Sequence, residues 1–150
     1  MNKFMKVALK EATKGINANE GGPFGCVIVK DGKIIARAHN QVLKKNDATC
    51  HGEIEAIRKA SKKFKSFDLS GCELYTTGEP CPMCLGAILW AKIEKVYYGS
   101  NIKDTELIGF DDKKFYETFL HKETILNELD RDECLKLYEQ YSKIENKKHY

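Results

Sequence analysis

The sequence has no long hydrophobic run, no proline-rich or serine-rich linker and no block of residues of one charge sign. Its longest apolar segment, Leu85 to Ala91, is far shorter than the ~20 residues that cross a membrane. The first residues, Met1 to Asn17, carry four lysines and lack the uninterrupted apolar stretch of a secretory signal. These absences favour a cytoplasmic protein that has no membrane-spanning segment.

The cytoplasm is a reducing compartment, which affects how the six cysteines are interpreted. There, closely spaced cysteines are more often metal ligands or catalysts than members of a disulfide framework. The net charge of +3 permits contact with nucleic acid but does not argue for it. A chain of 150 residues without repeats or linkers is expected to form a single domain over 1–150.

Hydrophobic periodicity predicts strands and helices in alternation. Asp31-Gly32, between two β-branched runs, is a strong hairpin signal because both turn positions need a positive φ. The expected elements are a helix over 4–12 weakened at Gly15, strands over 25–29 and 33–38, a helix over 51–63, a strand over 72–76, a buried helix over 82–91 and a strand over 95–98. A tail helix begins at Asp130, where Glu133 completes a capping box. This order predicts an α/β fold with a mixed sheet.

Two short motifs carry the chemistry: His51-Gly52-Glu53, and Pro80-Cys81-Pro82-Met83-Cys84 further along the chain. Catalytic zinc takes three nitrogen or thiolate ligands and leaves a fourth position for water. His51, Cys81 and Cys84 supply such a set. Pro82 suits the first turn of a helix, where unpaired N–H groups stabilise the thiolates of the two cysteines. One Zn²⁺ per chain is therefore expected.

Glu53 is the candidate acid and base. From the first turn of a helix its carboxylate can reach the metal pocket, take a proton from water and deliver it to a ring nitrogen and then to a leaving amine. The matching substrate has an amidine-like carbon that bears an amino group beside a ring nitrogen. Cytosine, adenine and guanine all offer one.

Other interpretations of the cysteines stay open. A C-x-x-C pair can be redox-active, and Cys50 or Cys72 could complete a four-ligand structural zinc site. The latter would make the chain a zinc-stabilised interaction module without turnover, in which Glu53 has no role. Cys26 and Cys134 fit small core residues, and the lysines over 59–65 fit a solvated helix face.

The two motifs match the H-x-E and P-C-x-x-C signature of the zinc nucleobase deaminases. With them in place, the chain resembles the cytidine deaminase superfamily, and within it the bacterial guanine deaminases, over nearly its whole length. The segments that favour guanine are Gly21-Gly22-Pro23-Phe24-Gly25, Gly109-Phe110-Asp111-Asp112 and the closing Asn146-Lys147-Lys148-His149-Tyr150.

This resemblance implies a three-layer α/β/α sandwich around a five-stranded sheet, in a homodimer whose C-terminal segments, about 130–150, are exchanged. It implies hydrolysis of guanine to xanthine and ammonia. Asp112 would join Glu53 as a catalytic residue that reads donor groups on the base. The implied substrate-binding residues are Phe24, Asn40, Gly52 through its N–H, Trp90, and Tyr150 from the partner subunit.

The chain departs from the family pattern at Gly52, where relatives usually carry Ala, and at Cys50 and His149. Gly52 loosens the first turn of its helix modestly, at about 1 kcal/mol of helix propensity relative to Ala, without loss of the site. Cys50 and His149 bear on fine substrate choice rather than on the chemistry. A tRNA adenosine deaminase shares the metal core and is the alternative enzyme. An enzyme that acts on tRNA needs a basic surface, which the weak net charge does not provide. The expected partner is therefore a small purine base rather than a nucleic acid.

Overall fold

The computed structural model describes residues 1–121, 126 and 128–145. Its centre is a four-stranded sheet in the order β2-β1-β3-β4. The strands are β1 (Gly25–Lys30), β2 (Lys33–His39), β3 (Cys72–Gly78) and β4 (Lys95–Ser100). β1 is antiparallel to both β2 and β3, whereas β3 and β4 are parallel, so the sheet is mixed as predicted. The β1–β2 turn has positive φ at both Asp31 (50°) and Gly32 (70°), which confirms the hairpin signal.

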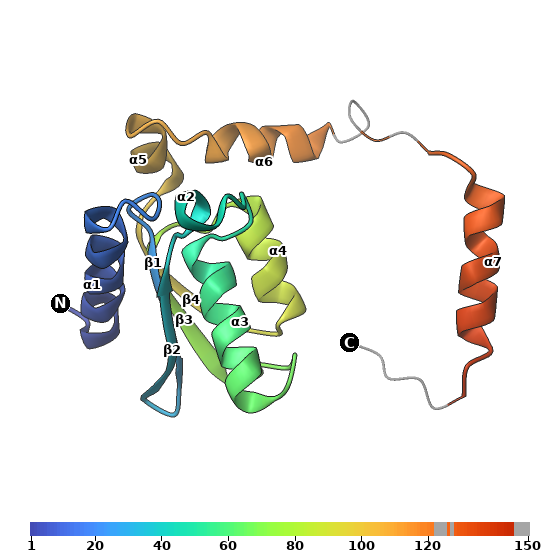
Figure 1. The fold of residues 1–150 in the computed structure, drawn as a ribbon, viewed down its shortest axis with the longest axis horizontal. Helices are drawn as coiled ribbons and strands as arrows, with labels where there is room; N and C mark the ends of the chain where they lie inside the picture. Colours follow the sequence, from blue (N-terminus) through green and yellow to red (C-terminus); the bar gives the residue numbers. More distant parts are fainter. Residues whose placement is uncertain (122–125, 127, 146–150) are drawn as a thin grey trace.

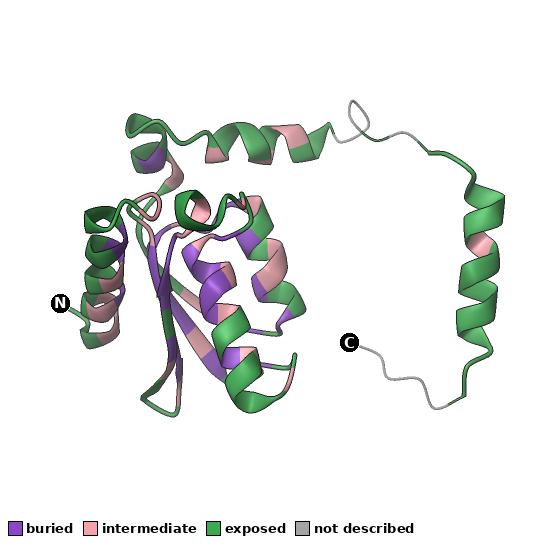
Figure 2. Cartoon of the chain, viewed as in Figure 1, coloured by how far each residue is buried: buried purple, intermediate pink, exposed green. Residues whose placement is uncertain are grey.

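Helices cover both faces of the sheet and make three layers (Figure 1). α1 (Lys3–Asn17) packs on one face, and α3 (Gly52–Phe64) and α4 (Pro82–Trp90) pack on the other. Because side chains alternate along a strand, Val27 and Val29 point toward α1 while Cys26 and Ile28 point toward α3 and α4. Figure 2 shows this buried centre between largely exposed outer surfaces.

The expectation of a fifth strand is wrong for the part of the chain that the structure describes. After β4 the chain turns into α5 (Ile102–Leu107) and α6 (Asp112–Leu120). Asn101 accounts for the turn, because its side chain accepts hydrogen bonds from the backbone of Lys103 and Asp104 in a capping box. β4 is left at the edge of the sheet with most of its residues exposed.

Gly15 does not shorten the first helix, contrary to expectation. α1 continues to Asn17, and Gly15 is buried within it. A Cβ at this position would lie 2.6 Å from the ring of His39, so the glycine lets α1 approach the end of β2. Close packing thus offsets the ~1 kcal/mol that glycine costs in a helix.

The tail helix α7 (Arg131–Ser142) forms as predicted but stands away from the rest of the molecule (Figure 1). Its capping box is wrong, since Asp130 has φ 52° and its side chain makes no capping hydrogen bond. Cys134, expected in the core, is exposed on this helix. Among the described residues, no helix is long and apolar enough to span a membrane.

Candidate active site

The candidate site lies at one end of the sheet, where three strands bring their flanking loops together. Phe24 precedes β1, Asn40 follows β2, and Cys81 follows β3 by a short loop. Because β1 runs antiparallel to the other two, its start meets their ends. The N-termini of α3 and α4 point to the same place, with His51 and Cys81 at the position before the first helical residue of each.

His51, Cys81 and Cys84 form the one group of three or more potential metal ligands found among the described residues. The Nδ1 atom of His51 is 3.6 Å from the Sγ of Cys81 and 3.5 Å from the Sγ of Cys84. In tetrahedral zinc coordination, a nitrogen and a sulfur ligand are separated by about 3.5 Å, given bonds of about 2.0 and 2.3 Å. The three side chains therefore fit a zinc ion, and three ligands leave one position open.

Cys50 and Cys72 are not part of this group. The Sγ of Cys50 lies 3.5 Å from the Nη1 of Arg58 and is not among the ligand atoms that come together at the cluster. Cys72 begins β3, at the other end of the strand from Cys81. The geometry thus does not support a closed four-ligand structural site.

The cluster favours thiolate. Hydrogen bonds from Cys84 and then from His51, opposed by burial, lower the pKa of Cys81 to about 4. The pKa of Cys84 is raised, first because its proton is shared with Cys81 and then by burial. The hydrogen bond to Cys81 raises the pKa of His51. The surroundings of Cys81 thus favour the thiolate, which is the form that binds a metal.

Glu53 is buried next to the metal ligands, with only 5% of its surface exposed. The Sγ of Cys84 is 3.6 Å from Glu53 Oε2, and the hydroxyl of Thr76 donates to Glu53 Oε1 at 3.2 Å. Burial raises the pKa of the Glu53 carboxyl. A carboxyl with a raised pKa beside a metal site is suited to take up and return protons near neutral pH.

Two hollows meet at the cluster. The larger, of roughly 560 Å³, is mostly apolar, and its lining includes Asn40, His51, Cys81, the first two residues (Val42 and Leu43) of the short helix α2 (Val42–Lys45) and three phenylalanines. The phenylalanines are Phe110, Phe115 and Phe119. The smaller, of roughly 30 Å³, reaches deeper and is lined by Phe24, Glu53 and Asp112 among others. A flat aromatic ring with a few polar edges suits such a lining.

Most of the predicted substrate residues come together here. Asn40 Oδ1 accepts a hydrogen bond from the backbone N–H of Val42 at 3.1 Å, which leaves the Asn40 amide nitrogen as a donor. Phe24 packs edge-on against Phe110, with 5.0 Å between ring centroids. Asp112 begins α6, and burial raises its pKa. Gly52 is buried as the first residue of α3, where a backbone N–H has no partner within the helix.

Trp90 and Tyr150 are not brought to the cluster by the described residues. Trp90 ends α4 and is 67% exposed, in a separate shallow hollow with Leu89 and Lys92. Since α4 rises about 1.5 Å per residue, Trp90 lies about 13 Å along the axis from Cys81. Tyr150 lies outside the described residues.

Sequence reasoning missed two neighbours of the site. Thr76 contacts Glu53, and Glu79 lines the smaller hollow while its carboxylate accepts a hydrogen bond from the Ile102 N–H. Glu79 precedes the Pro80-Cys81 motif directly, so its position was a usable signal. Thr76 is 23 residues from Glu53, and no sequence motif indicates that the two residues are in contact.

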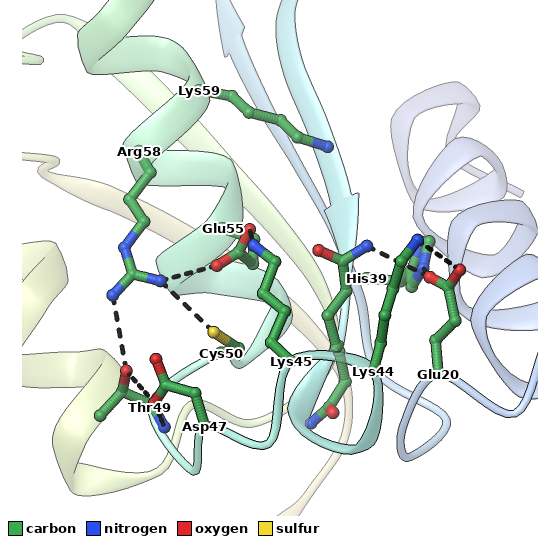
Figure 3. A network of polar contacts seen from close by, with 12 residues as sticks. Glu20, His39, Lys44, Lys45, Asp47, Thr49, Cys50, Glu55, Arg58 and Lys59 are labelled. Carbon is green, nitrogen blue, oxygen red and sulfur yellow. Dashed lines mark hydrogen bonds and ion pairs between the residues drawn. The ribbon is translucent and has the colours of Figure 1, made fainter.

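A polar network holds α2, one wall of the larger hollow (Figure 3). Lys44 Nζ is 2.7 Å from Glu20, and Lys45 Nζ is 2.6 Å from the buried Glu55. Glu20 also contacts the buried ring of His39 at 2.6 Å. α2 has no buried residue of its own, so these ionic contacts hold it together with hydrogen bonds from the Leu43 and Lys44 N–H groups to the backbone oxygen of Glu20.

Comparison with known proteins assigns the family. Residues 1–100 match the family described as cytidine and deoxycytidylate deaminase zinc-binding region, and the chain belongs to it. It is 52% identical to guanine deaminase of Bacillus subtilis over 114 residues, which are 76% of this chain and 73% of that protein. The X-ray structure of guanine deaminase from Bacillus subtilis matches 100% of this chain and 99% of its own, at 43% identity and a TM-score of 0.88. A tRNA-specific adenosine deaminase of Aquifex aeolicus is 45% identical over 65% of this chain and 64% of its own length.

The family model and the ligand geometry agree on a zinc site at His51, Cys81 and Cys84. The chain is accordingly a zinc-binding hydrolytic deaminase of a nucleobase-type substrate, as the motifs predicted.

Proposed function

We propose that the chain is a guanine deaminase that converts guanine and water to xanthine and ammonia. The observation that carries this proposal is the pairing of one donor and one acceptor around the metal site: the Asn40 amide nitrogen and the Asp112 carboxylate. Guanine offers acceptors at O6 and N7 and donors at N1 and the 2-amino group, so it satisfies both. The similarity to guanine deaminase of Bacillus subtilis points the same way.

In this proposal, His51, Cys81 and Cys84 would hold zinc, which would lower the pKa of a water molecule so that hydroxide is available at neutral pH. Glu53 Oε2 faces the cluster and would take a proton from the water molecule as its oxygen attacks carbon 2 of guanine. The same carboxyl would give this proton to the ring nitrogen N3, then take the remaining proton from the oxygen now bonded to carbon 2 and pass it to the amino group. The bond between carbon 2 and that nitrogen breaks, and ammonia leaves. Phe24 packs on the base plane, and the Gly52 N–H faces an acceptor.

The proposal includes a homodimer in which the C-terminal segments, about 130–150, are exchanged and Tyr150 closes the pocket of the partner subunit. Two observations support it. α7 stands apart from its own chain while it exposes Leu137 and Tyr138. The match to the Bacillus subtilis structure spans the whole chain, α7 included.

A reducing compartment such as the cytoplasm also belongs to the proposal, since all six cysteines are unpaired.

A tRNA adenosine deaminase is the second candidate, and the similarity to the Aquifex aeolicus enzyme favours it. Such an enzyme needs a basic surface around the pocket to track a phosphate backbone. Here the larger hollow is lined mostly by apolar side chains, and Lys44 and Lys45 are engaged by carboxylates. These features weigh against a nucleic-acid substrate.

A substrate panel scored by ammonia release tests the two candidates directly. The panel contains guanine, guanosine, adenine, cytosine, an amino-triazine and a tRNA stem-loop with an adenosine in its loop. We expect guanine to be hydrolysed much faster than the others. Faster turnover of the stem-loop adenosine would replace the proposal by its alternative.

A further inference from the structure

Thr76 is buried on the third strand, directly behind the candidate acid and base. Its side chain is 1% exposed and lies on the face of β3 that packs against α3, two residues along from Leu74. The hydroxyl donates a hydrogen bond of 3.2 Å to Glu53 Oε1, and both partners are buried.

The two oxygens of the Glu53 carboxylate therefore have different neighbours. Oε1 is bound by Thr76, whereas Oε2 lies 3.6 Å from the Sγ of the metal ligand Cys84. A carboxylate can rotate about its last bond, and that torsion is soft. A hydrogen bond to one oxygen fixes the plane of the group and so fixes where the other oxygen points.

We propose that Thr76 is a positioning residue that holds Glu53 Oε1 so that Oε2 faces the metal site. It touches neither substrate nor metal and acts only through Glu53. Catalytic proton transfer needs the carboxylate within hydrogen-bond reach of the proton it takes, and small errors of placement are costly. A rotated carboxylate would still be present but wrongly aimed.

The inference rests on the proposed guanine deamination for its rate measurement, and the variant is Thr76→Val. Valine keeps the shape and suits a strand, but it leaves Oε1 buried without its donor. We expect kcat to fall about ten- to a hundredfold, the range of a lost hydrogen bond to a charged group, with KM for guanine within about twofold. Thr76→Ser should restore most of the lost kcat.

Thr105→Val is the matched control. Thr105 is also buried, and its hydroxyl donates to the backbone oxygen of Asn101 within the turn that starts α5. Its loss should leave kcat and KM within about twofold, with one zinc per chain in all three variants. An equal fall of kcat in Thr105→Val, or no recovery in Thr76→Ser, would overturn the proposal.

A second readout does not depend on the substrate. Crystal structures of the zinc-loaded wild type and Thr76→Val are expected to show the Glu53 carboxylate rotated in the variant, with Oε2 displaced from Cys84. An unmoved carboxylate would overturn the positioning role whether or not guanine is the substrate. A wild-type protein that leaves guanine intact would contradict the proposed function alone, and the two structures would still decide the role of Thr76.

Discussion

Glu53 concentrates the proposed proton chemistry in one buried side chain. Glu53→Gln keeps the volume of the residue but removes the base. We expect zinc content and fold to be retained while turnover of guanine falls by several orders of magnitude, since each proton transfer is typically worth about 10²–10⁴-fold. Metal analysis and ammonia release measure the two properties separately. Near-normal turnover would remove Glu53 from the mechanism.

Asp112 lines the smaller hollow, and in the proposed function its carboxylate accepts hydrogen bonds from the donor groups of the base. Asp112→Ala leaves the N1 and 2-amino donors of guanine without an acceptor, so we expect kcat/KM for guanine to fall by 10²-fold or more. Asp111→Ala is the matched control, because Asp111 is the exposed neighbour that does not line the smaller hollow. The idea fails if steady-state kinetics find the two variants equally impaired.

The site residues differ in how well the sequence reveals them. His51, Glu53, Cys81 and Cys84 follow from spacing, because each pair sits in one helical turn whose position is set locally. Thr76 depends on the pairing of β3 with distant elements, which no short motif encodes. Trp90 stays a prediction that the described part of one chain does not bring to the cluster, since a helix that starts at the metal ligands carries its last residue away from them.

At the scale of elements, the strands and the longer helices were predictable because their apolar residues follow periods of two or 3.6. α2, α5 and α6 were missed. α2 has no buried residue, so it leaves no hydrophobic pattern, and the exposed phenylalanines of α6 meet solvent and the larger hollow rather than a core. α2 and α6 are held by polar contacts with residues far along the chain, such as Lys45 with Glu55 and Tyr116 with Pro80, whereas α5 has a local capping box.

The ionic contacts of α2 should affect substrate binding more than chemistry. Burial acts to raise the pKa of Glu55, but hydrogen bonds from Lys45 and Arg58 have the larger combined effect, so the pKa is lowered. The buried Glu55 carboxylate is therefore charged and is stabilised by these two cations. Lys45→Met removes one of them and frees the wall formed by Val42 and Leu43. We expect KM for guanine to rise severalfold, with kcat changed little. Lys62→Met, on the exposed face of α3, is the control. Equal KM values in both variants would show that the Lys45–Glu55 ion pair does not hold the α2 wall for substrate binding.

The Glu20 contact should give a pH-dependent contribution to stability. Hydrogen bonds from Lys44, then His39, then Gln41 lower the pKa of Glu20 from 4.5 to about 2. A carboxyl whose pKa is depressed on folding stabilises the protein above its unfolded pKa and loses that contribution as the pH falls through its folded pKa. Glu20→Gln should therefore lower the urea midpoint at pH 7, and the difference from wild type should shrink below pH 4.5. Both proteins are measured with a chelator so that loss of zinc at low pH does not affect the result. A difference in urea midpoint that does not change with pH would show that it does not come from the Glu20 carboxylate charge.

On the scale of the whole molecule, one chain leaves much apolar surface uncovered. Leu137 on α7, Phe119 on α6 and Leu89 on α4 are each more than 60% exposed, and the edge strand β4 is open. Isolated helices of twelve residues are marginal in water unless an apolar face packs on something. In the proposed homodimer, a second copy of the chain would supply a surface for α7 and receive an α7 in return, which would close the assembly with twofold symmetry.

Complementation between two inactive chains tests this exchange. One chain lacks Asn146 to Tyr150 and keeps Glu53, while the other carries Glu53→Gln and keeps its tail. Each homodimer should be nearly inactive with zinc bound. The Glu53→Gln homodimer lacks the base, and the tail-deleted homodimer cannot close the pocket, which would exclude water and strengthen the electrostatics of the site. In a heterodimer, the site that retains Glu53 receives the intact tail of its partner. Random mixing makes half of the dimers mixed, each with one complete site, so about a quarter of wild-type activity should return. Heterodimers that are verified by mass and remain inactive would show that the tail does not act in trans.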